Sequence, residues 1–481
     1  MKKTVKYIIL TAVAGAVLAS CQREQLPATA TGDGPRIISV SFADATKTAL
    51  DGIQAKFCAG DIILVSNGEE LEDCKVGLDD SGNAQITTTL KGELKAVYPS
   101  EAAVRNGNAI DLTQIRVPIA QRGRFKDAHI CTSTIAADGS SATFINRSAI
   151  LKFYVDKSIG VTSIKVTGTG ADIATGSRTI TVTAPSGKTL ANVTDDPQKR
   201  ICYVAVLPGV NANQLTFKTE ATTQLTLPRT PTADVTLEAG TLYKAFIPYY
   251  VTIGTQKWGY CNVGAFLPEE YGKMYSWGNP AGQSGNGTFN PQFNQTGYPT
   301  PGKSINSADD WTAAIHDAAY NDTNWGHNWL MPAAFTSLAA DGVWMWTSDY
   351  YGTGKKGYIV YVAKDDGDKG KAQINGTWKK WDGSQYAGSD APGATYDAKS
   401  DIHIFLPAAG YSDGTARKYG SNDLGYYWSS TFIGDEKARA LRFGNNELSP
   451  WNPDVRYHGR SIRPILNDDW HYRDLDDGGT I

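Results

Sequence analysis

Side chains suited to molecular recognition gather near the C-terminus, between Ala438 and Gly459. This stretch reads ARALRFGNNELSPWNPDVRYHG, and it is crowded with Arg, Asn, Trp, Tyr, His and Glu. Trp, Tyr and Arg contribute most of the binding energy at protein interfaces. The flat face of Trp451 or Tyr457 could also stack on a sugar ring. The composition favours a contact surface, although Asn and Gly could instead fill turns while Trp451 lies in the core.

Residues for catalysis or metal binding show no pattern that a reaction would need. No nucleophile, base and orienting group can be assembled from motifs. Asp365-Asp366-Gly367-Asp368 is acidic enough to hold Ca²⁺, but a solvated loop is the favoured interpretation. We therefore expect no enzyme, no cofactor and no metal site. The histidines that lack metal-ligand spacing are His316, His327, His403, His458 and His471.

The N-terminus carries the features of an export signal. Three lysines precede an apolar run, Tyr7–Ala19, that is too short to span a bilayer stably. The run ends in Leu18-Ala19-Ser20-Cys21, which resembles a bacterial lipobox. An ordinary secretory signal with a chance cysteine is the alternative. The resemblance predicts a signal peptide over 1–20, lipid attachment at Cys21, a tether over 21–35, and a surface-exposed chain anchored in the cell outer membrane.

Composition divides the chain into two chemically different modules. A length of 481 residues predicts several domains, and 49 glycines favour strands and loops. All 12 tryptophans lie at or after Trp258, whereas only Cys261 among the cysteines lies there. The net charge of −3 argues against a nucleic-acid partner. Cys58 with Cys74, or Cys131 with Cys202, could pair, but isolated buried thiols are the favoured interpretation.

The first module, residues 36–247, alternates short apolar runs with turn signals and shows no long amphipathic helix. This pattern predicts one β-sandwich or two in tandem. An ordered set of strings resembles the fimbrillin-like lipoproteins of Bacteroidetes: TKTALDG (46–52), FCAGDIILV (57–65), AVYP (96–99), VPIAQ (117–121), FINRSAILKF (144–153), YVAVLPG (203–209) and LEAGTLY (237–243).

That resemblance implies transthyretin-like sandwiches, and in the pilus-forming members of the family subunits join by donating a strand. Strand addition needs an open sheet edge. Arg36, just before the first strand, is a candidate for protease cleavage that would free an acceptor groove. The alternative is a module that serves only as a stalk.

The second module, residues 248–466, reads as a mixture of strands and short helices. We expect strands over Tyr250–Trp258, Val343–Tyr350 and Gly357–Ala363, and helices over 307–318 and 328–338. Residues 365–400 read as a charged insertion, and 467–481 as an unstructured tail. Three strings, Phe405–Tyr411, Tyr426–Thr431 and Arg460–Ile465, are expected to form scaffold.

The ordered motifs TIGxQxW, YxW, WxxP, LPAAGY, YWSST and SIRPI resemble the Fibrobacter succinogenes major paralogous domain. That resemblance implies an α+β fold of the C-type-lectin-like and formylglycine-enzyme-like class. The cysteines required by the oxidase relatives of that fold are missing after Cys261. Ala333, Ala334 and Phe335 replace the acidic residues usual after the WxxP motif.

The YWSST string, the polar stretch and the terminal GRSIRPI also resemble the variable proteins of diversity-generating retroelements. Those proteins use a lectin-like platform to present hypermutated surface residues. The resemblance implies these ligand-binding positions: Arg439, Arg442, Asn445, Asn446, Glu447, Ser449, Trp451, Asp454, Arg456, Tyr457 and His458.

The predicted protein is multidomain, with mainly β fimbrillin-like sandwiches followed by an α+β lectin-like domain. We expect a surface adhesin or ligand-binding protein whose head contacts an extracellular protein or glycan, as a fimbrial tip or accessory subunit. The membrane, through the lipid anchor, and other fimbrial subunits are the remaining predicted partners. The alternative is a purely structural subunit that assembles by strand exchange and binds no ligand.

Overall fold

The computed structural model describes most of the chain between residues 34 and 467. The described ranges are 34–43, 56–155, 160–192, 200–221, 234–282, 316–322, 324–326, 328–412, 417–418, 423–433 and 436–467. The signal peptide with Cys21, the tether up to residue 33, most of the helix expected over 307–318, and the tail from residue 468 lie outside them. No helix within the described ranges is long and apolar enough to cross a membrane.

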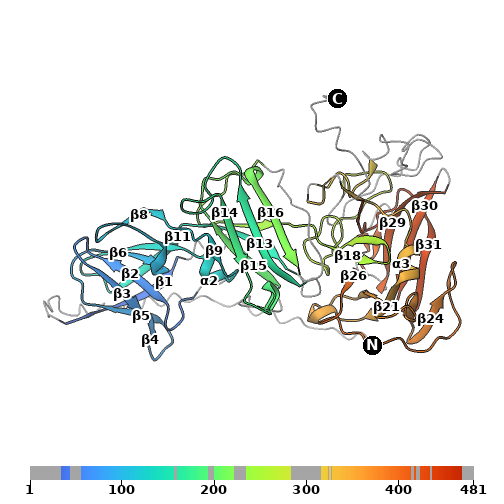
Figure 1. Ribbon diagram of the computed structural model, residues 1–481, viewed down its shortest axis with the longest axis horizontal. Coiled ribbons are helices and arrows are strands. Elements are labelled where there is room, and N and C mark those ends of the chain that lie inside the picture. The colour runs from blue at the N-terminus through green and yellow to red at the C-terminus, as the bar shows by residue number, and fades with distance from the viewer. Residues whose placement is uncertain are drawn as a thin grey trace, which may run out of the picture.

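The structure is mainly β, and its sheets form three bodies in a row along the long axis (Figure 1). The first body is an eight-stranded sheet in the order β3-β2-β6-β10-β11-β1-β5-β4. Its strands are β1 (Arg36–Phe42), β2 (Ile62–Ser66), β3 (Leu71–Lys75), β4 (Gly77–Leu78), β5 (Ala84–Thr88), β6 (Leu94–Tyr98), β10 (Cys131–Ile135) and β11 (Ser141–Asn146), beside the hairpin β7 (Ala103–Asn106) and β8 (Ala109–Ile115). Alternate residues such as Ile38, Val40 and Phe144 are buried, which packs one face of the sheet into a core.

Strand β1 is paired on both sides, parallel to β11 and antiparallel to β5. Arg36 at its start donates hydrogen bonds from its guanidinium to the carbonyls of Gly92, Ala136 and Gly139, at 2.9, 3.0 and 2.9 Å. These bonds fasten the start of β1 to two neighbouring loops. The Arg36 side chain is therefore engaged with the fold and does not extend freely into solvent.

The second body contains two smaller sheets, in the orders β15-β12-β17 and β16-β13-β14-β9. Every residue of β12, the central strand of its sheet, is buried, and so is every residue of β15 at the edge. The only α-helix described here is a single turn, α2, which agrees with the lack of helical periodicity in the sequence. The elements are β9 (Ala120–Gln121), α2 (Phe125–Ala128), β12 (Ala149–Tyr154), β13 (Val161–Gly168), β14 (Thr179–Thr183), β15 (Ile201–Val206), β16 (Leu215–Ala221) and β17 (Leu242–Ala245).

The third body, which we call the head, combines sheets in the orders β18-β19-β32-β20, β25-β24-β23-β21-β22-β26 and β29-β30-β31 with the ribbon β27-β28. Its strands are β18 (Tyr250–Ile253), β19 (Gln256–Gly259), β20 (Trp329–Leu330), β21 (Gly342–Thr347), β22 (Gly357–Val362), β23 (Lys371–Ile374), β24 (Thr377–Trp381), β25 (Tyr386–Ala387), β26 (His403–Pro407), β27 (Tyr411–Ser412), β28 (Arg417–Lys418), β29 (Gly425–Phe432), β30 (Lys437–Gly444), β31 (Glu447–Val455) and β32 (Ile465–Leu466). The helix α3 (Thr336–Asp341) is the one α-helix of the head within the described residues, so the α part of the predicted lectin-like fold stays a prediction.

Two expected elements of the head were wrong, and a third segment contains strands that the sequence did not predict. Residues 250–258 form a hairpin because Gly254 turns the chain at a φ of +62°. The helix expected over 328–338 begins only at Thr336, since Trp329 and Leu330 pair with β32 instead. The insertion over 365–400 contains three paired strands, β23 to β25, whose partners lie in the same large sheet.

The strings expected to be scaffold do hold the head together. All five residues of β26 are buried. The buried guanidinium of Arg463 donates hydrogen bonds to the carbonyls of Gly259, at 3.0 Å, and Phe405, at 2.5 Å. One side chain thus joins the start, middle and end of the head sequence.

The described cysteines, Cys58, Cys74, Cys131, Cys202 and Cys261, are all free thiols. Cys58 is exposed, which corrects the expectation of burial at this position, and the other four are buried. Burial raises the pKa of both Cys74 and Cys202 to about 12. These two thiols therefore pack as apolar side chains and stay protonated.

Candidate functional site

The sheet β29-β30-β31 is largely buried, and a few of its side chains remain partly exposed. Arg442 lies opposite Tyr426 on β29 and Ser449 on β31, so these three side chains share one side of the sheet. The register shifts between Ala440 and Arg442, where β31 contains one extra residue next to Trp451. We call the partly exposed residues of this sheet that were predicted to bind a ligand, together with Tyr426, the recognition face: Tyr426, Arg439, Arg442, Glu447, Ser449 and Trp451.

Arg439 and Trp451 form one end of the recognition face. The guanidinium carbon of Arg439 lies 4.9 Å from the centroid of the Trp451 ring, and its Nη1 donates a hydrogen bond to the Trp451 carbonyl at 3.2 Å. A cation stacked on an aromatic face is held in position by the ring quadrupole. Trp451 is only partly buried, so the interpretation that placed it in the core is wrong.

Arg442 forms the centre of the face. It lies opposite Tyr426 on β29 and Ser449 on β31, and it pairs with Glu447 at 3.0 Å. The side chains of Arg442 and Glu447 are 39% and 36% exposed. A pair this exposed contributes little to stability, typically about 0–1 kcal/mol, so both charges are available to a partner at small cost.

Two predicted ligand-binding positions, Asp454 and Arg456, are wrong as surface residues because both side chains are buried. Asp454 pairs with the buried Arg460, and its Oδ1 lies 2.9 Å from Nδ1 of His458. The guanidinium of Arg456 stacks 5.0 Å from the Trp277 ring centroid. Both residues fasten the end of β31 and the chain just after it to the core. The local sequence could not reveal these contacts, because their partners are distant in the chain or follow a turn.

The remaining predicted positions lie at the two ends of the β30–β31 hairpin. Asn445 and Asn446 are exposed in the turn, where the Asn445 carbonyl accepts the Asn375 amide at 2.8 Å. Tyr457 and His458 are partly exposed after β31, with ring centroids 4.8 Å apart. These four residues therefore border the recognition face at its opposite ends.

The recognition face continues into residues that the sequence assigned to scaffold. Tyr411 and Tyr426 are partly exposed and their ring centroids lie 5.3 Å apart. The Arg460 guanidinium stacks 4.5 Å from the Tyr426 centroid. The string GYYWSST carries no alternation that singles out Tyr426, since Tyr427 and Trp428 after it are both buried.

The acidic string Asp365–Asp368 is occupied by structural contacts. Asp366 pairs with Lys369 at 2.7 Å, while Asp368 accepts hydrogen bonds from the Ala394 amide and the Tyr396 hydroxyl. Among the described residues, no group of three or more His, Cys, Asp or Glu side chains is placed to hold a metal ion.

No protein-family model matches the chain, and no curated protein matches it either. Similar solved structures include a fimbrial protein from Bacteroides ovatus (11% identity, covering 90% of this chain and 99% of that one, TM-score 0.28). A protein provisionally described as a cell adhesion protein from Bacteroides uniformis (12%, 44% and 91%, 0.26) and the C-terminally truncated tip fimbrial protein Mfa3 from Porphyromonas gingivalis (8%, 44% and 94%, 0.21) are also similar. At these identities and TM-scores the likeness assigns no function to the chain.

Proposed function

We propose that the chain is a surface protein that adheres through the recognition face of its head. In this proposal Cys21 carries the lipid anchor in the outer membrane and residues up to 35 form the tether. The two β bodies that follow act as a stalk, and the head contacts a protein or glycan outside the cell.

The observation that carries the proposal is the arrangement of Arg and aromatic side chains on β29 to β31. Arg439 stacks on Trp451, and Arg442 lies between Tyr426 and Glu447, so two guanidinium groups on this sheet are held by aromatic rings at partly exposed positions. Rigid aromatic rings and pre-positioned guanidinium groups lose little conformational entropy on binding. Figure 1 shows β30 and β31 at the end of the long axis farthest from the first body, where a partner could approach.

The test is adhesion of the full chain to surfaces coated with mucin, as a glycoprotein, or fibrinogen, as a protein. We expect binding to at least one surface. The double variant Arg439→Ala/Trp451→Ala should bind more weakly by about 2 kcal/mol, roughly 30-fold, which is the effect of losing an interface hot spot.

A matched control is Tyr250→Ala/Lys257→Ala, which removes a cation–aromatic pair of similar geometry, 5.2 Å apart, from a different sheet of the head. This variant should bind like the native chain. Equal loss in both variants, or unfolding of the head by Arg439→Ala/Trp451→Ala alone, would show that the pair is structural and would overturn the proposal.

A second candidate function is that of a structural subunit that joins copies by strand addition. Strand β16 pairs with β13 along seven residues, and within the described residues no strand pairs with its other side. An open edge of this length can accept an extended segment. Assembly would give a ladder of oligomers in mild detergent, and Thr219→Pro in β16 would be expected to abolish it. Unchanged assembly in the variant would exclude this edge.

A further inference from the structure

A cleft of about 530 Å³ lies where the second body meets the head. Its volume falls within the range of about 300–1,000 Å³ that is typical of small-molecule sites. The cleft is separate from the recognition face, because its walls come from the loops after β21 and β25 and from the start of β15. The residues that matter for its chemistry are Arg200, Thr347, Asp349, Tyr351, Asp397 and Lys399.

Backbone strain converges on this cleft. Arg200 and Tyr351 have φ angles of +51° and +53°. The other described residues besides glycine with positive φ are Asn375 and Asp423, and Asn and Asp adopt this conformation readily, whereas Arg and Tyr do so at a cost of about 1–2 kcal/mol. These two residues with unfavourable φ angles contact each other, with the Arg200 guanidinium 5.0 Å from the Tyr351 ring centroid. Strain of this kind is typical of sites that hold a ligand in fixed geometry.

The side chains around the cleft are held in place before any ligand binds. The Tyr351 hydroxyl donates to the Ala398 carbonyl, and Oδ1 of Asp349 accepts the Gly354 amide at 2.6 Å. Oδ1 of Asp397 accepts the Lys399 amide at 2.9 Å. Among the described residues none donates a hydrogen bond to the second oxygen, Oδ2, of either carboxylate, and this oxygen can accept one from a ligand.

The balance of charge indicates what kind of molecule fits. The buried Glu269 pairs with Arg200 and neutralises it, which leaves the Asp349 and Asp397 carboxylates opposed by Lys399. An anionic ligand would be repelled by both carboxylates. A strongly apolar ligand would leave the carboxylates without hydrogen-bond donors. The cleft offers two carboxylates, one ammonium group, the Thr347 hydroxyl and an aromatic ring. These groups match the hydroxyls and the apolar C–H face of a pyranose.

We infer that this junction cleft binds a neutral monosaccharide unit of a glycan. Asp349 and Asp397 accept hydrogen bonds from sugar hydroxyls, Lys399 donates one, and Tyr351 contacts the apolar face of the ring. The site is independent of the recognition face, so either one can fail a test without the other.

The test is saturation-transfer NMR on the full chain with methyl α-mannopyranoside, methyl β-galactopyranoside and N-acetylglucosamine. N-acetylneuraminic acid is the anionic comparison. We expect saturation of at least one neutral sugar with a Kd of the order of ~1 mM. Asp349→Asn and Asp397→Asn should each weaken binding roughly tenfold, since an amide offers hydroxyls a weaker acceptor than a carboxylate.

The two variants should fold, because both side chains are exposed and the Asn oxygen can still accept the local amide. Asp138→Asn, which changes an exposed carboxylate of the first body, should leave sugar binding unchanged. The inference is overturned if none of the neutral sugars binds, if N-acetylneuraminic acid binds more tightly than they do, or if binding survives in the Asp349→Asn/Asp397→Asn double variant.

Discussion

At the residue scale, Asp454 is the buried charge that fixes the end of the recognition face. Burial alone would raise its pKa, but the contacts with His458 and Arg460 outweigh burial and lower the pKa from 3.8 to about 2. Because the folded pKa lies below the unfolded value, the ionised carboxylate stabilises the head above that unfolded value. The contribution, about 2 kcal/mol, is lost as the pH falls through the folded pKa.

Asp454→Asn is therefore expected to destabilise the head at neutral pH by about 3 kcal/mol, since Arg460 would remain buried without a counter-charge. In this variant the free energy of unfolding should also depend less on pH in the acid range. The measurement is the opening free energy of β30 and β31 amides by hydrogen exchange. Exposed Asp138→Asn is the control and should change nothing. A native-like acid profile in Asp454→Asn would contradict the assignment.

His129 provides a second acid-sensitive residue, in the first body. Its ring contacts Phe42 and Phe125, with centroids 4.6 and 5.1 Å away. Burial lowers its pKa from 6.5 to about 4. The unfolded chain therefore binds the proton first, and stability falls by up to about 3 kcal/mol as the pH drops from the unfolded to the folded value.

His129→Leu should remove this dependence while keeping an apolar side chain among the aromatic rings. Hydrogen exchange of the β6 and β10 amides at pH 7 and pH 4.5 measures it. We expect the native chain to lose protection at the lower pH and the variant to keep it. Equal loss of protection in the two proteins would rule out His129 as the cause.

At the element scale, close strand packing fixes the position of β22 against β26. Gly357 lies opposite Pro407, and an added Cβ would come within 2.2 Å of the Leu406 carbonyl oxygen and 2.9 Å of the Phe405 ring. Backbone cannot move aside as a flexible side chain can. This pair of strands therefore tolerates no side chain at position 357.

Gly357→Ala is expected to destabilise the head by about 1–3 kcal/mol or more, as overpacking of a core does. Gly77→Ala, in β4 of the first body, is the matched control because its nearest neighbour would be 4.0 Å away. Calorimetry of the two variants should lower the melting temperature only for Gly357→Ala. Similar melting temperatures would mean that β26 shifts to make room.

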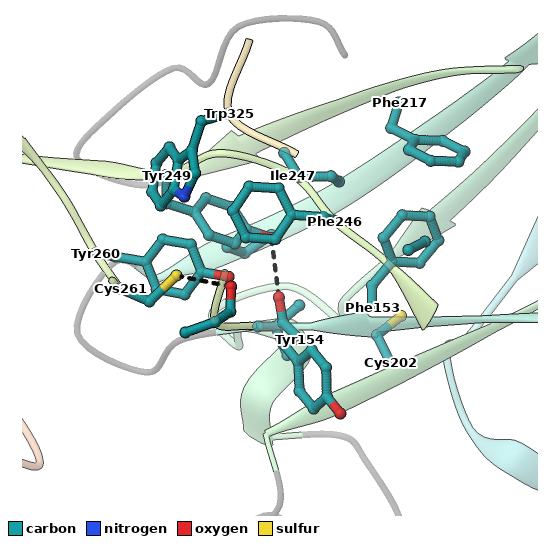
Figure 2. Packing of buried hydrophobic residues seen from close by; sticks show 14 of the residues in the cluster. Phe153, Tyr154, Cys202, Phe217, Phe246, Ile247, Tyr249, Tyr260, Cys261 and Trp325 are labelled. Atoms are coloured by element: carbon teal, nitrogen blue, oxygen red, sulfur yellow. Dashed lines mark hydrogen bonds between the residues drawn. The ribbon is translucent and has the colours of Figure 1, made fainter. Parts of the chain in front are cut away.

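At the scale of the whole molecule, one hydrophobic cluster begins at Leu64 and Val97 of the first body and runs through the second body into the head. Figure 2 shows Phe246 with Tyr260 and Trp325, whose rings contact it, and also Phe153 and Cys202 of the same cluster. The Tyr249 hydroxyl donates to the Tyr154 carbonyl at 3.3 Å across this junction. The Arg200–Glu269 ion pair joins the same two bodies with both side chains buried. A shared core predicts that they unfold together.

Glu269→Gln is expected to cost about 3 kcal/mol, because it removes the charge partner of a buried guanidinium. Lys356→Gln, which breaks the exposed Lys356–Asp423 pair, should cost less than about 1 kcal/mol. Calorimetry should show one transition for the second body and the head in the native chain. Two well-separated transitions, or equal effects of both variants, would contradict the shared core.

The sequence by itself determined most of the strands and the scaffold strings. Alternation in Ile37–Phe42 and the apolar run Ala149–Val155 specify strands locally, since a period of two has few other solutions. The partial exposure of Arg439 and Trp451 agrees with their composition, because a polar, aromatic stretch between scaffold strings fits poorly into a core.

Only the tertiary structure decided which polar residues are buried and which strands meet. Arg456 and Asp454 read as surface residues, yet they find Trp277, His458 and Arg460 through space, and such partners are not encoded in local spacing. The bulge after Ala440, the pairing of Trp329 with β32 and the meeting of Arg200 with Tyr351 likewise depend on segments far apart in the chain. Long-range contacts compete with local preference, and where they prevailed the predicted helix and the predicted surface positions were wrong.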